Sequence, residues 1–340
     1  MLRFYSKYLL TTLVVLNFIH AQDVPTPEVV SKVGTAAANW LKLESGARAI
    51  GMGGAHVAAG DGISSIPYNP ASLGFIRGSQ LYYSKSNYVA DITHSVLSYG
   101  TQLTATDYFA IHMFNVDSGE IEETTTADPY GTDRMFKVKD FAFRLVYSKR
   151  LTDRLLVGVS LKYIYESIYN AYMSGMALDV GSNFDTGIYG FVLGMSVNSF
   201  GPDVQFHGEG LEKAVDTDVN VSGVMVEKTE SFSLPMTFRL GLKNDIIGMG
   251  EHSFVKMEGQ RLTVSVDAIN PIDYTLYYSM GAEYAWNEFA FVRAGTHVGH
   301  DTAGLSAGGG VKVGGFYIDY AFADYGLLKN THQFGLRFGF

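Results

Sequence analysis

The feature that most constrains this chain is the alternation of apolar with small or polar residues along most of its length. Between residues 141 and 148, large apolar residues take the odd positions, and Ala142, Arg144, Val146 and Ser148 take the even ones. Successive side chains of a β-strand point to opposite faces, so this period of two predicts two-faced strands. Helical periodicity is nearly absent beyond residue 78, which predicts an all-β fold.

Fourteen segments follow this alternation. We expect strands over residues 79–86, 92–100, 107–116, 138–149, 153–166, 170–182, 187–199, 233–243, 260–270, 274–285, 288–297, 303–313, 315–324 and 329–340. The two longest connections, 117–137 and 200–232, follow the third and seventh strands, whereas tight turns at 149–153 and 286–288 follow even ones. When both ends of a barrel face the periplasm, the connections after odd strands lie on the external side and are the long ones. The lengths seen here follow that rule.

Two all-β architectures compete: a soluble sandwich or propeller, and a transmembrane barrel. A soluble protein would expose one strand face to water, yet only 17% of the residues are charged while 14% are aromatic. Most expected strands reach about 10 residues or more, which is enough for a tilted strand to cross a bilayer. Membrane barrels also carry aromatic girdles at both interfaces. We therefore predict an antiparallel transmembrane β-barrel of 14 strands.

The end of the chain supports a barrel in the outer membrane. Alternate positions of the last strand are occupied by Phe334, Leu336, Phe338 and Phe340, and Phe340 is the final residue. A terminal aromatic residue on an alternating strand resembles the signal that the outer-membrane barrel assembly machinery reads. We expect this machinery and outer-membrane lipid to be partners of the protein.

The beginning of the chain reads as a secretory signal peptide over residues 1–21. It has basic residues at Arg3 and Lys7, an apolar stretch over 8–19 and a small residue at Ala21. The stretch is too short to cross a bilayer as a helix, although an N-terminal anchor is the alternative. The prediction is export to the outer membrane of a Gram-negative-type bacterium.

Residues 22–77 lack clean alternation, so we expect three parts: a signal peptide over 1–21, a hatch over 22–77 and a barrel over 78–340. The segment holds a possible short helix over 35–43 and a run of small residues over 46–55. That run has neither the dinucleotide-binding nor the Walker spacing. Small residues instead suit a plug packed against the wall of a barrel lumen.

Two groups of hatch residues carry particular expectations. Glycine lets backbone approach backbone closely, whereas proline fixes its own φ and biases the preceding residue away from helix. An asparagine amide can bond free backbone groups nearby. We expect close packing against the wall at Gly51, Gly53 and Gly54, and a latch at Asn69, Pro70 and Ala71.

The hatch motifs, Gly-Ala-Arg-Ala-Ile-Gly-Met-Gly-Gly-Ala over 46–55 and Tyr-Asn-Pro-Ala-Ser-Leu-Gly over 68–74, resemble the PorV/PorQ family. This family lies within the wider FadL (long-chain fatty acid transporter) class of outer-membrane barrels. The resemblance extends along the chain through residues 90–94, 151–154, 200–203, 234–239 and 319–326. It implies a 14-stranded barrel with an N-terminal hatch.

The resemblance implies two alternative functions. PorV and PorQ imply a non-enzymatic role in type IX protein secretion or surface attachment, with secretion components and secreted proteins as partners. An acidic external loop containing Glu120, Glu122, Glu123 and Asp128 suits such contacts. The FadL class implies instead the transport of long-chain fatty acids or other hydrophobic small molecules.

Charged residues fall on the inward positions of the expected strands. They are Arg144, Lys162, Arg239, Asp267, Glu283, Arg293, Asp319 and Arg337. Neighbouring strands would pair Arg239 with Asp267, Glu283 with Arg293, and Asp319 with Arg337. We expect a lattice of salt bridges that braces the hatch; the alternative is a polar track for a substrate.

Catalytic and cofactor sites are not expected. The chain has no Cys, and its net charge of −9 gives no basic field for nucleic acid. The Gly-x-Ser-x-Gly pattern over 304–308 lacks the strand-to-helix turn of serine hydrolases.

Two weak metal signals are also present. His297, His300 and Asp301 share one short loop, without a further fixed ligand. A calcium-loop spacing occurs at Asp216, Asp218, Asn220 and Glu227, but Val221 stands where the loop needs glycine. We therefore expect no metal at either place.

Overall fold

The computed structural model describes residues 32–217, 221–226, 229–250 and 253–340. The expected signal peptide over 1–21 and the first residues of the expected hatch lie outside the described residues. So do Asp218, Asn220 and Glu227 of the calcium-loop spacing.

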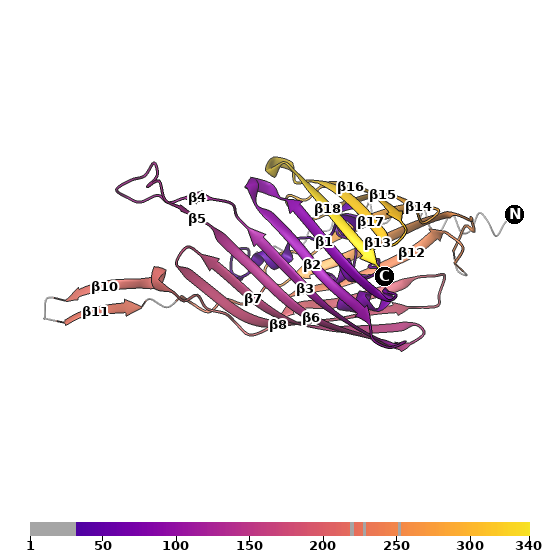
Figure 1. The fold of residues 1–340 in the computed structure, drawn as a ribbon, viewed down its shortest axis with the longest axis horizontal. Helices are drawn as coiled ribbons and strands as arrows, with labels where there is room; N and C mark the ends of the chain where they lie inside the picture. Colours follow the sequence, from indigo (N-terminus) through magenta and orange to yellow (C-terminus); the bar gives the residue numbers. More distant parts are fainter. Residues whose placement is uncertain (1–31, 218–220, 227–228, 251–252) are drawn as a thin grey trace, which may run out of the picture. The chain divides into compact units, whose positions relative to one another are not determined.

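Fourteen strands close into one antiparallel barrel, in which β1 pairs with β18 and every other neighbour follows chain order (Figure 1). This confirms the predicted strand count and fold. The strands are β1 (Ser79–Asn87), β2 (Thr93–Gln102), β3 (Asp107–Asp117), β6 (Val138–Thr152), β7 (Leu155–Ile168), β8 (Ala171–Asp185), β9 (Val192–Phe200), β12 (Thr237–Ile247), β13 (Gln260–Pro271), β14 (Tyr277–Trp286), β15 (Ala290–Val298), β16 (Leu305–Val313), β17 (Phe316–Asp324) and β18 (Asn330–Gly339).

Each strand has one buried and one exposed face, as β6 illustrates. Arg144 and Ser148 are buried on its inner face, whereas Leu145 and Tyr147 are exposed on its outer face. This inverts the pattern of a water-soluble protein, because the polar and small side chains point inward. An apolar outer surface of this kind is the one that a lipid bilayer accommodates.

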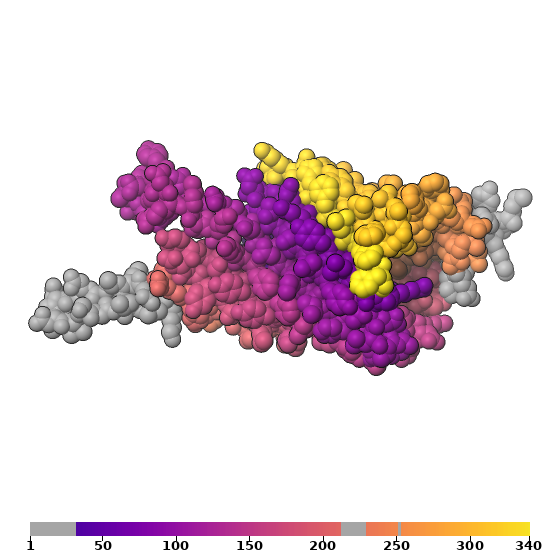
Figure 2. Space-filling model, viewed as in Figure 1, coloured from indigo at the N-terminus to yellow at the C-terminus, as the bar shows by residue number. Residues whose placement is uncertain are grey.

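The barrel closes where the last residue of the chain meets the first strand. Ser79 and Phe340 exchange two backbone hydrogen bonds, of 2.9 and 3.0 Å. The Phe338 ring stacks on the rings of Phe316 and Phe340, at centroid distances of 4.3 and 5.4 Å. Figure 2 shows β18, in yellow, running directly beside the indigo β1 on the outer face.

The connections depart most from the sequence prediction in three places. The two longest are not plain loops, because they carry the hairpins β4 (Ile121–Glu122) with β5 (Met135–Phe136), and β10 (Glu212–Thr217) with β11 (Val221–Val226). The strand expected from residue 187 begins five residues later, since Gly187 and Gly190 adopt positive φ in the preceding turn.

Residues 36–76, which we call the N-terminal segment, contain short helices. These are η2 (Asn39–Lys42), α2 (Ala47–Gly51), η3 (Ile63–Ser65) and η4 (Pro70–Phe75); three more, η5 (Val89–Asp91), η6 (Glu209–Leu211) and η7 (Gly326–Leu328), lie in barrel connections. The helix expected over 35–43 is thus shorter than predicted. In the described part of the chain, no helix is both long and apolar enough to cross a membrane.

The N-terminal segment packs against many strands of the barrel, with different helices on different strands. Helix α2 contacts β15 to β18, whereas η4 contacts β3 and β6 to β8. Most of the segment is buried, including Met52, His56 and Asn69. One continuous stretch of chain therefore joins inward-facing side chains of distant strands.

The closing seam predicts a strong effect of Phe340→Asp. A charge in place of the terminal ring removes the apolar residue that directly follows β18, so the amount of membrane-inserted protein should fall sharply. Heat-modifiable mobility on a gel measures the inserted fraction. Leu327→Asp, at a fully exposed position between β17 and β18, is the matched control and should insert normally. Normal insertion of Phe340→Asp would contradict the assembly role of this residue.

Candidate functional site

The contact between α2 and the wall depends on glycines from both sides. A Cβ added at Gly51 would lie only 3.2 Å from the Cα of Gly308 on β16. A Cβ added at Gly53 would overlap the backbone nitrogen of Thr296. Gly295 on β15 is equally restricted, because its Cβ would overlap the backbone of Met52 and Gly53. Backbone therefore meets backbone at this place.

Gly54 differs from its two neighbours in what it touches. A Cβ at Gly54 would overlap the carboxylate of Glu44, which belongs to the same N-terminal segment. Its φ of +73° is also one that favours glycine. The need for glycine here comes from the segment itself rather than from the barrel wall.

Asn69 joins the other end of the segment to the wall. Its Oδ1 accepts a hydrogen bond of 3.0 Å from Ala71 N and so caps η4. Its Nδ2 donates to Val57 O and to Ser182 O on β8, both at 3.0 Å. Because Asn69 is fully buried, the loss of these bonds would leave polar groups without partners.

Two wall glycines make room for this end of the segment. A Cβ at Gly158 on β7 would overlap Pro70 and Ala71, and a Cβ at Gly181 on β8 would overlap the side chain of Asn69. The expected latch residues thus lie together against β7 and β8. They precede the start of β1 at Ser79 by several residues.

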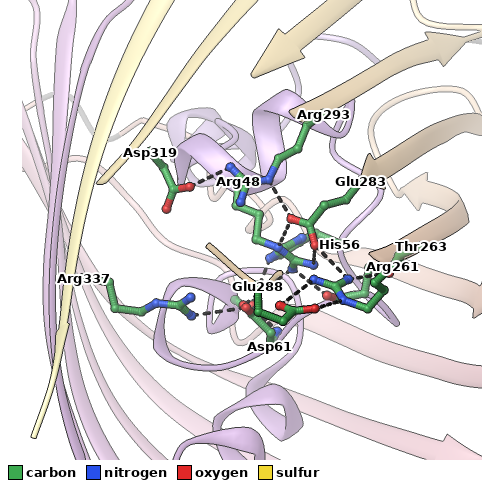
Figure 3. A network of polar contacts seen from close by, with 12 residues as sticks. Arg48, His56, Asp61, Arg261, Thr263, Glu283, Glu288, Arg293, Asp319 and Arg337 are labelled. Atoms are coloured by element: carbon green, nitrogen blue, oxygen red, sulfur yellow. Dashed lines mark hydrogen bonds and ion pairs between the residues drawn. The ribbon is translucent and has the colours of Figure 1, made fainter. Parts of the chain in front are cut away.

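A network of buried ions joins α2 to β13, β14 and β15 (Figure 3). The carboxylate of Glu283 forms ion pairs with three arginines: Arg48 Nε at 2.8 Å, Arg293 Nε at 2.7 Å and Arg261 Nη1 at 3.0 Å. Arg293 also donates to Asp319 on β17 at 2.6 Å. One carboxylate on the wall therefore holds an arginine of the N-terminal segment and two arginines of the barrel.

Asp61 extends this network to the last strand. It pairs with Arg337 on β18 at 3.3 Å and with Arg48 at 3.5 Å. Burial disfavours its charged form, but Arg337 and Arg48 outweigh burial and hold the pKa of Asp61 below its ordinary value. The expected pairing of Asp319 with Arg337 is thus replaced by two others, since Arg293 takes Asp319 and Asp61 takes Arg337.

A second ionic cluster lies on β6, β7 and β8. Lys162 Nζ is 2.9 Å from Asp179 Oδ1 and 2.9 Å from Ser199 Oγ. Arg144 lies 3.7 Å from the other oxygen of Asp179 and contacts His112 at 3.0 Å. Sequence reasoning named Arg144 and Lys162 but missed Asp179, although Asp179 stands at an inward position of the alternation in β8.

The expected pair of Arg239 with Asp267 does not form within the described residues. The register places Ile269 opposite Arg239 and Gly241 opposite Asp267. Asp267 instead accepts hydrogen bonds from the backbone of His56 and Val57, at 2.7 and 2.8 Å. Arg239 lies over the ring of Tyr68, 5.5 Å from its centroid. Both residues therefore contact the N-terminal segment rather than each other.

A cavity of about 200 Å³ lies between η2 and the connections that follow β1, β15 and β17. Two ion pairs border it, Lys42 with Asp273 at 2.6 Å and Glu44 with His297 at 3.0 Å. Burial opposes the charge of Glu44, but His297 and Arg239 hold its pKa below the ordinary value. Both ion pairs tie the N-terminal segment to the barrel.

The weak metal signal at His297 and His300 finds no support in this geometry. His297 bonds Glu44, and His300 Nδ1 accepts from the backbone of Thr302 and Ala303. Among the described residues, no three His, Asp or Glu side chains converge on a position for a metal ion. Ser306, of the serine-hydrolase pattern, lies within β16 and is buried.

A larger groove of about 530 Å³ lies along the wall at β7, β8, β9, β12 and β13. Its lining side chains are mostly those of the outer face, including Val180, Met195, Phe238 and Leu240. The groove is therefore open to the side that contacts lipid.

Glu283→Gln should destabilise the protein by about 3–5 kcal/mol, because it leaves three arginines around one uncharged amide. Chemical denaturation in detergent measures this loss. Glu288→Gln is the matched control, since Glu288 also pairs with Arg261 but is largely exposed; its effect should be about 1 kcal/mol or less. Equal losses for the two variants would show that the buried network does not hold the structure.

Two of the solved structures similar to this chain are a channel and a transporter. One is the CymD monoaromatic hydrocarbon channel, with a TM-score of 0.56 and 13% identity. Another is the toluene transporter TodX from Pseudomonas putida, with a TM-score of 0.54 and 16% identity. Each alignment covers 87% of this chain and 97% of the other. At these identities the likeness is one of fold, and this chain is an outer-membrane β-barrel.

Sequence comparison gives the family. No curated protein matches the chain. A family model described as type IX secretion system protein PorV matches residues 27–226, which is more than half of the 340 residues. The match includes Gly51, Gly53, Asn69 and the cluster around Asp179. The chain belongs to the PorV family.

Proposed function

We propose that this chain serves type IX secretion as a non-enzymatic outer-membrane protein that contacts secreted proteins or secretion components. The observation that carries the proposal is the match to the family of the type IX secretion system protein PorV over residues 27–226. Outer-membrane lipid and the barrel assembly machinery are partners of the protein during its insertion.

The N-terminal segment acts in this proposal as a hatch that closes the lumen. Its support is the dense contact of the segment with the wall: glycines that admit no Cβ, the hydrogen bond of Asn69 to Ser182 on β8 and the ion network around Glu283. These contacts fix the segment to several strands at once. A barrel closed in this way suits a protein that works through its external surface.

The non-enzymatic part of the proposal draws support from a serine–histidine pair in the N-terminal segment that resembles a nucleophile with its base. Ser65 Oγ lies 3.0 Å from His56 Nε2. Both side chains are fully buried, and burial lowers the pKa of His56 to about 3. The pair is out of reach of a substrate, and its contacts are those of hatch packing.

The external surface carries features suited to a protein partner. The hairpin β4–β5 holds the acidic loop, in which Glu123 pairs with Arg134 at 2.7 Å while Glu122 is exposed. Tyr130, in the same connection, is 99% exposed. We propose that this connection contributes to binding of secretion components.

Transport of hydrophobic small molecules is the second candidate. The observation that favours it is the fold shared with the hydrocarbon channel CymD and the toluene transporter TodX. The groove of about 530 Å³ does not add to it, since its lining belongs mostly to the outer face of the wall.

A deletion strain separates the two functions. Loss of the gene should leave type IX cargo proteins off the cell surface and out of the medium, while uptake of long-chain fatty acids and toluene stays at the wild-type level. Comparative proteomics of surface and medium, with radiolabelled uptake in parallel, measures both. Normal secretion with reduced uptake would refute the secretion role in favour of transport.

A glycine pair tests the hatch. Gly53→Ala should displace the segment, because overpacking at such a site costs about 1–3 kcal/mol, and single-channel conductance in planar bilayers should rise. Gly34→Ala is the matched control: Gly34 also has positive φ, of +82°, but nothing lies within 4 Å of its Cβ position. Its conductance should stay at the wild-type level.

Asn69→Leu extends the test to the latch, and its conductance should rise as well. If conductance stays at the wild-type level in Gly53→Ala and Asn69→Leu while secretion is lost, these residues contact a partner directly. The hatch role would then be wrong although the secretion role stands.

A further inference from the structure

Two carboxyl groups face each other across β6 and β7 on the inner face of the barrel. The register places Asp140 directly opposite Glu166, and residues opposite each other in an antiparallel pair have Cβ atoms about 4.5–5.5 Å apart. Asp140 is only 6% exposed, and Glu166 is half-buried. Two negative charges on opposed residues, one of them buried, repel more strongly than they would in bulk water.

No basic side chain neutralises this pair in the described part of the chain. The neighbours in the same row are apolar: Val116 on β3 beside Asp140, and Met173 on β8 beside Glu166. The next position beyond Val116 is His94 on β2, which is buried with neither ring nitrogen hydrogen-bonded. The buried Oδ1 of Asp140 likewise has no hydrogen-bond partner there.

Glu166 also holds the start of the N-terminal segment. Its Oε2 accepts one hydrogen bond from Ala38 N and one from Trp40 Nε1, both at 3.1 Å. The indole of Trp40 is buried, with its ring centroid 5.9 Å from that of Phe114. Any change of charge at the pair therefore acts on the anchor of Trp40.

The pair stands near the end of the membrane-spanning part of the wall. The adjacent outward positions are occupied by Asp117, Lys139 and Ser167, which stand opposite one another in the register of β3, β6 and β7. Polar residues on the outer face mark the boundary of the lipid-facing band. The two carboxyl groups thus lie where protons from the aqueous side can reach them.

We infer that Asp140 and Glu166 share one proton, and that this shared proton fastens the N-terminal segment to the barrel through Trp40. Adjacent carboxyl groups avoid their repulsion when one of them stays protonated. The protonated carboxyl of Asp140 then donates to Glu166, which keeps Oε2 free for Ala38 and Trp40. A metal ion is the less suitable neutralising species, because no third His, Asp or Glu joins the pair within the described residues.

The sign of the pH dependence follows from this arrangement. The folded protein holds a proton that separated carboxyl groups would release, so the fastening is complete at low pH and weakens as the pH rises through the titration of the pair. When both groups are ionised, their repulsion separates β6 from β7 at this point and frees Trp40. The inference is independent of the secretion role.

Trp40 itself reports the state of the pair. In a Trp286→Phe background, which removes the exposed tryptophan, Trp40 emission is recorded in detergent between pH 5 and 10. We expect a reversible red shift as the pH rises. Asp140→Asn, whose amide donates to Glu166 at every pH, should remove the shift, and so should Glu166→Gln, whose amide oxygen still accepts from Trp40.

Asp117→Asn is the matched control, since this acid lies at the same height on the outer face and should leave the shift intact. Heat-modifiable mobility confirms that each variant is inserted. A wild-type emission that does not change between pH 5 and 10 would overturn the inference, and so would an unchanged shift in Asp140→Asn. A shift that follows added Na⁺ or Ca²⁺ at constant pH would replace the proton by a bound cation and overturn it as well.

Discussion

The constraint on which this structure depends is that lipid covers the outer face of the barrel, so charged side chains at the level of the lipid-facing band point inward, where most of them meet a partner. A barrel of 14 strands encloses more space than its own side chains fill. The N-terminal segment provides the missing partners: Arg48 meets Glu283, Asp61 meets Arg337, and the backbone of His56 meets Asp267. The charged side chains of the wall therefore account for the position of the N-terminal segment, and the segment accounts for how those charges are neutralised inside the barrel.

The contacts of the segment divide into two kinds with different physical roles. At Gly53 and Gly295 the backbones touch, which sets the position of the chain through steric exclusion and leaves no room for adjustment. At Glu283 the contacts are ionic, and removing one partner of a buried ion pair is costly because it leaves an uncompensated charge. Close backbone contact thus fixes the position of the N-terminal segment, and the ion pairs reinforce which strands it contacts.

The strands were predictable from sequence because a period of two is a local signal, and all fourteen are present. The inward location of Arg144 and Glu283 followed from the same signal. The partners did not follow: Asp61 lies in a segment without periodicity, so its contact with Arg337 depends on three-dimensional placement. Ser199, which accepts a hydrogen bond from Lys162, was not predictable, since an irregularity in the register of β8 and β9 brings Ser199, with a φ of +60°, beside Asp179.

The seam between β1 and β18 has a consequence for the order in which the chain is assembled. Asp61 binds Arg337 on β18, while Phe340 at the end of that strand closes the ring against Ser79. Asp61 and Arg337 are 276 positions apart, and Ser79 and Phe340 are 261 apart, so these contacts are highly non-local and form late. The barrel therefore closes in the same step in which Asp61 of the N-terminal segment binds the last strand. A chain truncated before β18 would lose both the closing seam and this contact.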